Sequence, residues 1–295
     1  MPKLLIVAFA LLFGTSVFSK IPPAEKKALE ALYTATKGDQ WFISWDLSQP
    51  VNKWQGVKVV KNHVVSVSLM NNNLSGSLPT SIGDLKRLEI LNLAFNNIEG
   101  TLPETLVQLG NLQILRLGKN HISGSIPENI DQLKKLVVLD LFSNKISGKI
   151  PSTLGNVSNL MVISMSNNNI TGRIPESLGL LQKLVRLEIA DNNIFGDVPE
   201  AIANLSNLEM LVLAENRLSG EFPLNIFQIS SLQVLEMQNN EFNQNQFRDH
   251  IPVNSDLALF TFDEPGAYIK DIRFEELYKR RDSKMADTKF EDDEN

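Results

Sequence analysis

The chain has 295 residues, a formal net charge of −6 and no cysteine. Without a thiol it can form no disulfide, no thiolate metal site and no cysteine nucleophile. Its acidic balance, with basic residues dispersed along the sequence, argues against nucleic acid as a partner, because proteins that bind nucleic acid gather their cations into patches.

Residues 1–19 predict a secretory signal peptide. Lys3 precedes an apolar run over residues 4–13, and Val17 and Ser19 suit the positions before a cleavage site. An uncleaved membrane anchor is the alternative, but the run is short for a span, which needs about 20 residues. We therefore expect cleavage near Ser19, after which the chain has no stable membrane span.

Residues 20–63 precede the repeats and predict an N-terminal cap. Residues 25–33 have helical apolar spacing, and Trp41, Trp45 and Trp54 follow them. A cap is needed because the first coil of a stack would otherwise expose apolar side chains and an open sheet edge. We expect the tryptophans to form the core of this cap rather than a cage for a ligand.

Residues 64–240 repeat with a period of 24. A glycine recurs in each unit, with a proline three residues after it and an asparagine four residues before it. The glycines are Gly76, Gly100, Gly124, Gly148, Gly172, Gly196 and Gly220. The L-x-L stretch of each unit alternates with period two and predicts a short strand, and the Asn, Gly and Pro predict turns. One coil cannot bury its own apolar edge, whereas about eight stacked coils can, so the repeat predicts an α/β solenoid with a parallel sheet.

The repeated asparagine, glycine and proline positions, each of which forms a column when the coils are stacked, favour a structural interpretation over a functional one. We expect each asparagine to point inward and to hydrogen-bond backbone groups of the bends, because a buried amide persists only when it is satisfied. We expect the glycines to adopt turn conformations closed to other residues and the prolines to fix a bend.

The regular register ends after Asn240. Gln244 and Phe247 stand where a glycine and a proline would continue it. Residues 241–278 gather several aromatic side chains and predict a C-terminal cap, with a candidate strand in residues 257–262. Residues 279–295 are dense in charges of both signs and predict a disordered tail.

The pattern LxxLxLxxNxLxGxIP, as in residues 88–103, resembles the plant-type subclass of the leucine-rich repeat family. Residues 28–57 resemble the cap of that subclass, ALxxLYxATxGxxW…WxGV. The resemblance implies a curved right-handed superhelix, capped at both ends, whose parallel sheet lines the concave face. The plant cap carries two cysteines where this chain has Asn52 and Lys58, which weakens a plant source and favours a bacterial or protist one.

No pattern in the chain indicates catalysis. The three histidines fall at unrelated phases of the repeat, and no glycine-rich phosphate loop is present. We therefore expect a protein that is not an enzyme and has no catalytic residue, cofactor or metal. Such repeats serve mainly as recognition scaffolds.

The outward side chains of the strands and of the turns after them predict a contact surface. We expect an apolar ridge broken by Arg186, two exposed aromatics, a basic spot near the N-terminal half and an acidic C-terminal half. β-branched residues simply suit strands, which is the alternative explanation of the ridge. The candidate partner-binding residues are Ile90, Asn92, Phe95, Arg116, Lys119, Asp140, Phe142, Arg186, Glu188, Asp191 and Glu215.

The sequence thus predicts an exported protein, secreted or at the cell surface, that binds a protein or peptide ligand through its concave face. A cell-surface glycan is a further candidate ligand. Two alternatives stay open: an inhibitor of a secreted polysaccharide-degrading enzyme, and a receptor-like ectodomain that signals through a membrane partner. Four glycosylation sequons matter only in a eukaryotic host; they begin at Asn73, Asn156, Asn169 and Asn204.

Overall fold

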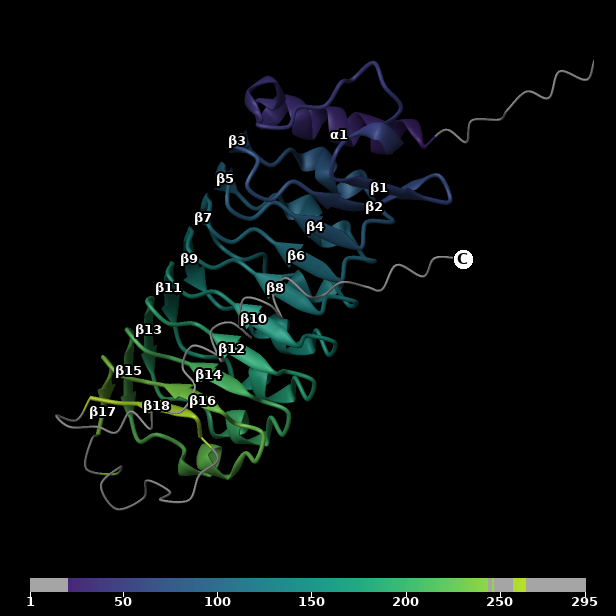
Figure 1. The fold of residues 1–295 in the computed structure, drawn as a ribbon. Coiled ribbons are helices and arrows are strands. Elements are labelled where there is room, and N and C mark those ends of the chain that lie inside the picture. Colours follow the sequence, from purple (N-terminus) through teal and green to yellow (C-terminus); the bar gives the residue numbers. More distant parts are fainter. Residues whose placement is uncertain (1–20, 244–245, 247–256, 264–295) are drawn as a thin grey trace, which may run out of the picture.

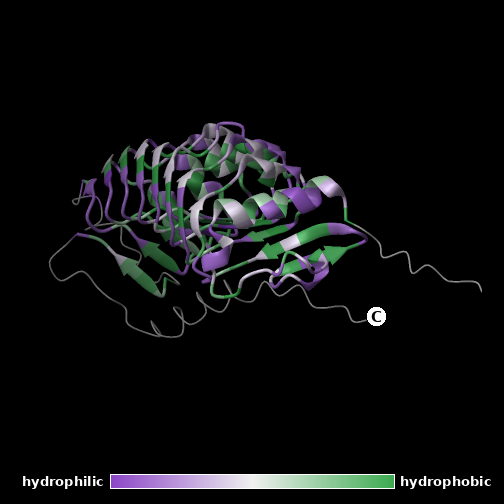
Figure 2. Ribbon diagram, turned by 90° about the horizontal axis from the view of Figure 1, so that it is seen from above, coloured by the Kyte–Doolittle hydropathy of each residue, from purple (hydrophilic) through white to green (hydrophobic). Residues whose placement is uncertain are grey.

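The computed structural model describes residues 21–243, 246 and 257–263. They form a stack of coils that runs from helix α1 (Pro23–Ala35) to strand β18 (Leu259–Thr261) (Figure 1). The 3₁₀ helices of the repeated coils, in residues 80–228, lie on the side of the stack opposite its larger sheet (Figure 2). The predicted signal peptide at 1–19, the predicted tail at 279–295 and most of the predicted C-terminal cap at 241–278 lie outside the described residues.

Ten strands among the described residues form the larger sheet, which we call the concave sheet after the face where the resemblance places it. Strands β1 and β2 pair antiparallel as a hairpin, and every later pair is parallel. The register advances by 24 residues a strand, so that Leu91 lies opposite Leu115 and Leu115 opposite Leu139. The strands are β1 (Val57–Val60), β2 (His63–Ser68), β4 (Ile90–Asn92), β6 (Ile114–Arg116), β8 (Val138–Asp140), β10 (Val162–Ser164), β12 (Arg186–Glu188), β14 (Met210–Val212), β16 (Val234–Glu236) and β18.

Each coil also adds a strand to a second sheet and then turns through a short 3₁₀ helix. The strands of the second sheet are β3 (Ser75–Ser77), β5 (Asn97–Thr101), β7 (His121–Gly124), β9 (Lys145–Lys149), β11 (Asn169–Gly172), β13 (Asn193–Gly196), β15 (Arg217–Gly220) and β17 (Glu241–Phe242). The 3₁₀ helices are η1 (Gly38–Gln40), η2 (Val51–Lys53), η3 (Thr80–Asp84), η4 (Glu104–Gln108), η5 (Ile130–Gln132), η6 (Ser152–Asn156), η7 (Glu176–Leu180), η8 (Glu200–Asn204) and η9 (Leu224–Gln228).

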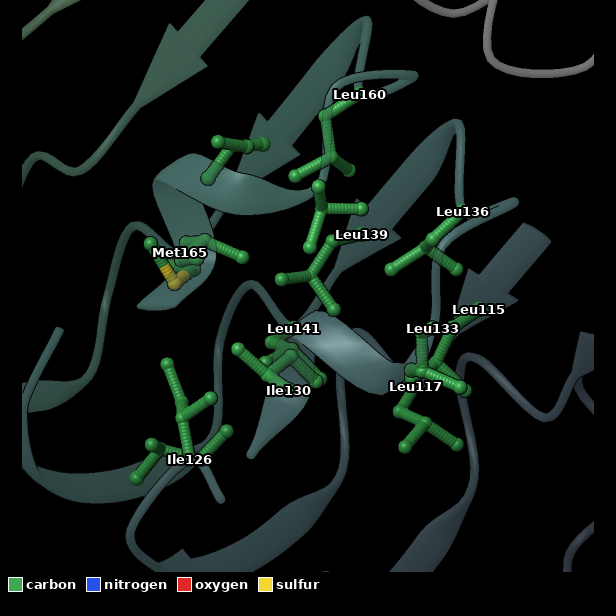
Figure 3. Close-up of a cluster of buried hydrophobic side chains, with 14 of the residues drawn as sticks. Leu115, Leu117, Ile126, Ile130, Leu133, Leu136, Leu139, Leu141, Leu160 and Met165 are labelled. Atoms are coloured by element: carbon green, nitrogen blue, oxygen red, sulfur yellow. The ribbon is translucent and has the colours of Figure 1, made fainter. Parts of the chain in front are cut away.

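The core fills the space between the concave sheet and the 3₁₀ helices (Figure 3). Leu115 and Leu117 point inward at 0% exposure, and Arg116 between them points outward, as the period-two pattern predicts. Each coil places its own leucines against those of its neighbours, so burial accumulates along the stack. A fully buried leucine contributes about 1.5–3 kcal/mol relative to an exposed one.

The repeated asparagines form a buried ladder, which confirms the structural interpretation of their column. In one rung, Asn120 Nδ2 donates to the carbonyls of Leu117 at 2.9 Å and of Leu93 at 3.0 Å. Its Oδ1 accepts from the backbone N–H of Ile98 at 2.9 Å. Each rung therefore ties its own coil to the one before it. At the last described coil, the Asp263 carboxylate accepts from the backbone N–H of Asn240 at 3.2 Å, where the next coil would offer a carbonyl.

Two turn positions in each coil have left-handed backbones. The repeated glycines have φ between 75° and 119°, which confirms their predicted conformation. The residue before each ladder asparagine also has positive φ, as at Phe95 (59°) and Lys119 (58°). This second position holds asparagine, phenylalanine, lysine, serine, aspartate or glutamate, so it presents varied side chains at the same point of successive coils.

The N-terminal end of the stack is closed by α1 and the aromatic side chains after it. The ring of Trp45 stacks on Trp54 with a centroid distance of 4.8 Å, and Trp41 meets Trp45 edge-on at 4.9 Å. All three tryptophans are buried, so they form a local core rather than a ligand cage. Glu25 ties α1 to the sheet, since its carboxylate accepts from the backbone N–H of Val64 at 2.8 Å.

Candidate functional site

The candidate site lies on the N-terminal half of the concave sheet, at the carboxyl ends of β4, β6 and β8. The parallel register sets Asn92, Arg116 and Asp140 side by side on adjacent strands. Ile90 and Asn92 are half-buried, and Arg116 is half-buried beside them. The structure therefore brings together the predicted contact residues of this half of the face.

Phe95 and Phe142 form an aromatic bridge across one intervening coil. Their ring centroids are 5.9 Å apart and the rings meet at 65°, an edge-to-face geometry. Gly118 of the coil between them makes room, because a Cβ at that position would lie 2.3 Å from Phe142 Cδ1. Phe95 remains 48% exposed. Phe142 is half-buried rather than exposed as predicted, because its ring lies over Gly118 and against Phe95.

A groove of about 470 Å³ opens beside Phe95, where the turns of four successive coils meet. Lys119, His121 and Lys145 bring basic groups to it, and all three are exposed. Within the described ranges none of them forms an ion pair. An exposed ring beside the two lysines, which form no ion pair among the described residues, suits a ligand that carries an apolar group next to a carboxylate. The other groove residues are Asn71, Asn96, Asn97, Asn120, Ser143 and Asn144.

Asp140 is buried at 3% exposure, whereas the sequence predicted an exposed acid. It lies beside Arg116 and leans over Gly118, where an added Cβ would be 2.8 Å from its Oδ1. The same oxygen accepts from the backbone N–H of Phe142 at 3.3 Å. Burial raises the pKa of Asp140 to about 6, against the opposing effects of the Phe142 hydrogen bond and of Arg116. Burial also lowers the pKa of Arg116, and Asp140 opposes that change.

Arg186 and Glu188 were also predicted to be exposed, and both are buried, at 7% and 4% exposure. They stand two residues apart on the outer face of β12 and form an ion pair between Nη2 and Oε1. Ser164 on one side donates to Glu188 at 3.3 Å, and Met210 Sδ on the other lies 3.7 Å from Arg186 Nη2. The pair is therefore enclosed by its neighbours and electrically neutral. Of the acids in the predicted contact set, only Asp191 and Glu215 are exposed.

The predicted apolar ridge is largely covered. Ile114, Val138 and Val234 are buried, while Val162 and Met210 are half-buried. Side chains in one column of a parallel sheet stand only about 4.8 Å apart, so neighbours cover each other's flanks. The large apolar side chains exposed in these coils are therefore separate residues, Met70, Phe95 and Met161, rather than a continuous ridge.

The sequence analysis missed Gly118, His121 and Lys145. Gly118 carried a readable signal, because it is the smallest residue of its column and lies one coil from each phenylalanine. His121 and Lys145 belong to β7 and β9 of the second sheet, so a search of the first strand of each coil and the turn after it could not find them.

The chemistry of this surface is that of binding. Its groups are an aromatic ring, cations and amides, which supply dispersion contacts, charge and hydrogen bonds. In the part of the chain that the structure describes, no three histidines or acids gather closely enough to hold a metal ion. The same part has no helix that is both long and apolar enough to cross a membrane.

This geometry defines a repeat solenoid with a candidate recognition surface beside its parallel sheet. Two family models match the repeats: a leucine-rich repeat region over residues 67–193 and a leucine rich repeat over residues 182–242. The chain belongs to the leucine-rich repeat family, and its solenoid fold is the one that the residue pattern predicted.

Its relatives include plant receptors. A probable leucine-rich repeat receptor-like protein kinase of Arabidopsis thaliana is 39% identical over 93 residues, which are 31% of this chain and 9% of that protein. The crystal structure of PEPR1–AtPEP1 superposes with a TM-score of 0.68 at 32% identity, covering 74% of this chain and 32% of that one. This chain therefore spans a small part of the kinase and about a third of the receptor chain.

A plant ice-binding protein is similar over most of both chains. Its structure has a TM-score of 0.64 and 27% identity, and the match covers 76% of this chain and 81% of that one. The match extends beyond receptors, so membership of the family establishes the scaffold and leaves the ligand to be argued from the surface.

Proposed function

We propose that this chain is an exported recognition protein that binds a peptide or protein segment at the aromatic bridge and the groove beside it. The ligand places an apolar side chain against Phe95 and a carboxylate near Lys119 and Lys145. No catalytic step is part of this function. Export is supported by the predicted signal peptide, and by the relatives, which include the leucine-rich repeat ectodomain of the Arabidopsis thaliana receptor kinase GASSHO1/SCHENGEN3.

The observation that carries the proposal is the exposure of Phe95 at the rim of a groove. Phe95 is 48% exposed, and its ring packs edge-to-face on Phe142 beside the groove rather than standing alone on the surface. Aromatic side chains fixed in this way are typical anchors of interfaces. The cations around it have no acidic partner among the described residues, so they remain available to a ligand.

A display library of peptides, selected on the wild-type chain, tests this proposal. We expect the selected peptides to lose affinity on the order of thirtyfold for Phe95→Ala, the loss typical of a truncated aromatic anchor. The matched control is Phe195→Ala, because Phe195 is 46% exposed on β13 of the second sheet and should not contact the ligand. Peptides that bind wild type and Phe95→Ala equally well would place the ligand elsewhere.

The inhibitor alternative has less support from this surface. It relies on an acidic patch in the C-terminal half, and Asp140 and Glu188 are buried there, which leaves Asp191 and Glu215 as its exposed acids. A double change of Asp191→Lys and Glu215→Lys tests it directly. If that variant inhibited a secreted polysaccharide-degrading enzyme as well as wild type did, the acidic patch would have no part in inhibition.

A further inference from the structure

The loops that lead from the 3₁₀ helices into the concave strands carry a row of cations. In each coil two residues precede the leucine that enters the strand, and these two positions alternate from coil to coil. Cations occupy both positions in the coils of β4 and β8 and the second position in the coil of β12, whereas the coils of β6, β10 and β14 have a glycine or serine followed by an asparagine. We call the five cations the basic edge: Lys86, Arg87, Lys134, Lys135 and Lys183.

Side-chain hydrogen bonds fix this alternation in space. Lys135 Nζ donates to Asn111 Oδ1 at 2.8 Å, and Asn111 Nδ2 donates to the carbonyl of Lys86 at 2.8 Å. The same links recur two coils later. There Lys183 Nζ donates to Asn159 Oδ1 at 2.7 Å, and Asn159 Nδ2 donates to the carbonyl of Lys134 at 2.9 Å. Each of these lysines donates one N–H to the neighbouring asparagine and has two N–H groups left for a ligand.

The basic edge is exposed and lacks opposing charge. All five cations are exposed, and among the described residues none of them forms an ion pair. Asp84 and Glu89 lie near its N-terminal end and Asp131 precedes Lys134 in the sequence, whereas residues 181–185 contain no acid. A chain with a net charge of −6 thus keeps an ordered, unneutralised row of cations on one edge. Ordering a lysine side chain costs conformational entropy, and the interaction with a bound anion would offset this cost.

The row is narrow and regularly spaced. Strands of a parallel sheet lie about 4.8 Å apart, so cations that recur every second coil are separated by ~10 Å along the stack. A row one or two side chains wide suits a thin polymer that lies along the edge. A duplex or a bilayer requires a broad basic surface, which an acidic chain with a single basic edge does not offer.

We propose that the basic edge binds a linear anionic polysaccharide that runs along the stack. Its carboxylates pair with Lys135 and Lys183, and its hydroxyls accept from the remaining lysine and asparagine N–H groups. This edge lies at the amino ends of the concave strands, whereas Phe95 and its groove lie at the carboxyl ends, so the two sites lie at opposite edges of the concave sheet (Figure 1). The proposal does not depend on the peptide site, and the two ligands can be bound together.

Binding of the full chain to a polyuronate, measured by calorimetry beside an uncharged glucan of similar length, tests the proposal. We expect binding to the polyuronate alone, weakening as salt is added. Lys135→Gln with Lys183→Gln should lower the affinity on the order of tenfold. The control, Lys149→Gln with Arg217→Gln, removes two exposed charges from the second sheet and should leave the affinity within about twofold of wild type.

A third variant separates the ordered edge from mere positive charge. Asn111→Ala with Asn159→Ala keeps every cation but releases Lys135 and Lys183, and it should weaken binding by about threefold. Thermal unfolding of each variant verifies that the stack is intact. The proposal is overturned if both charge-removing variants lose equal affinity, or if the glucan binds as well as the polyuronate. It is also overturned if RNA or anionic lipid vesicles bind the basic edge and the polyuronate does not.

Discussion

The chain buries polar groups in two regions, and it satisfies them in opposite ways. Inside the stack, the ladder asparagines from Asn96 to Asn240 bond to backbone N–H and carbonyl groups in the same pattern. On the outer face of the concave sheet, Arg186 and Glu188 are buried as deeply, but their partners are each other and the side chains of Ser164 and Met210. Asp140, on the same face, is also buried and accepts from the backbone N–H of Phe142. The ladder is a property of the repeat, whereas the outer cluster is a property of individual coils.

This difference shows where specificity can reside. A ladder asparagine cannot change without leaving backbone groups unpaired, since the backbone offers no alternative partner. Arg186 and Glu188 can be exchanged as a pair, because side chains supply both sides of their interaction. The face therefore accepts variation in sets of two or three residues, and this freedom allows one scaffold to carry different recognition surfaces.

The largest effect is expected inside the ladder. Asn144→Ala removes the acceptor of the Ile122 N–H and the donor to three carbonyls, those of Leu117, Leu141 and Phe142. Because these groups are buried, we expect the free energy of unfolding to fall by about 4 kcal/mol. Urea unfolding gives this value, and hydrogen exchange at Ile122 shows whether the loss is local.

Asn240 is the matched control for the ladder. It makes the same set of bonds at the last described coil but is only half-buried, so water can replace the lost partners. We expect Asn240→Ala to cost about 2 kcal/mol. Equal costs at the two positions would mean that burial does not set the strength of a rung.

A smaller effect is expected for Glu188→Leu on the outer face. The change leaves the buried Arg186 guanidinium without its countercharge, which should lower the free energy of unfolding by about 3 kcal/mol. Adding Arg186→Met to that variant should recover all but about 1 kcal/mol, because an apolar pair no longer carries a charge that must be desolvated. Urea unfolding of the single and double variants measures the recovery. A double variant as unstable as the single one would contradict the view that Arg186 and Glu188 can be exchanged as a pair.

The same difference explains what the sequence could and could not predict. The sequence predicted the burial of Leu115, Leu117 and Asn120 correctly, because these residues repeat in phase. The same repeat predicted the strands, the turns and the buried face. The candidate strand in residues 257–262 is also present, as β18, although it lies beyond the regular repeats. For all of these residues, position within the coil determines the environment.

The sequence predicted the environment of the outer-face residues only in part. These residues were placed on the correct side of their strands, but the exposure of Asp140, Arg186 and Glu188 was predicted wrongly. Their burial depends on which side chains stand in the adjacent coils, such as Gly118 beside Asp140 and Met210 beside Arg186. The basic edge was missed for a related reason, since its cations appear dispersed in the sequence and align only when coils are stacked. The 24-residue period predicts where a residue lies within its coil, but it does not predict which side chains of neighbouring coils that residue contacts.

The smallest effect we expect is a dependence on pH that separates Asp140 from the ladder. Its pKa in the folded chain is about 6, above its usual value of 3.8, so between these values the folded chain holds a proton that the unfolded chain has lost. The contribution of Asp140 to stability therefore falls as the pH rises from about 4 to about 6, and it stays low above that range. Asp140→Asn removes the buried charge. Its free energy of unfolding should therefore be about 2 kcal/mol higher than that of wild type at neutral pH and equal to it near pH 4. Urea unfolding at the two pH values measures the difference.

A ladder asparagine has no proton to lose, so Asn144→Ala should lower the free energy of unfolding by the same amount at both pH values. If Asp140→Asn also showed no change with pH, Asp140 would not be the buried acid that the outer cluster requires.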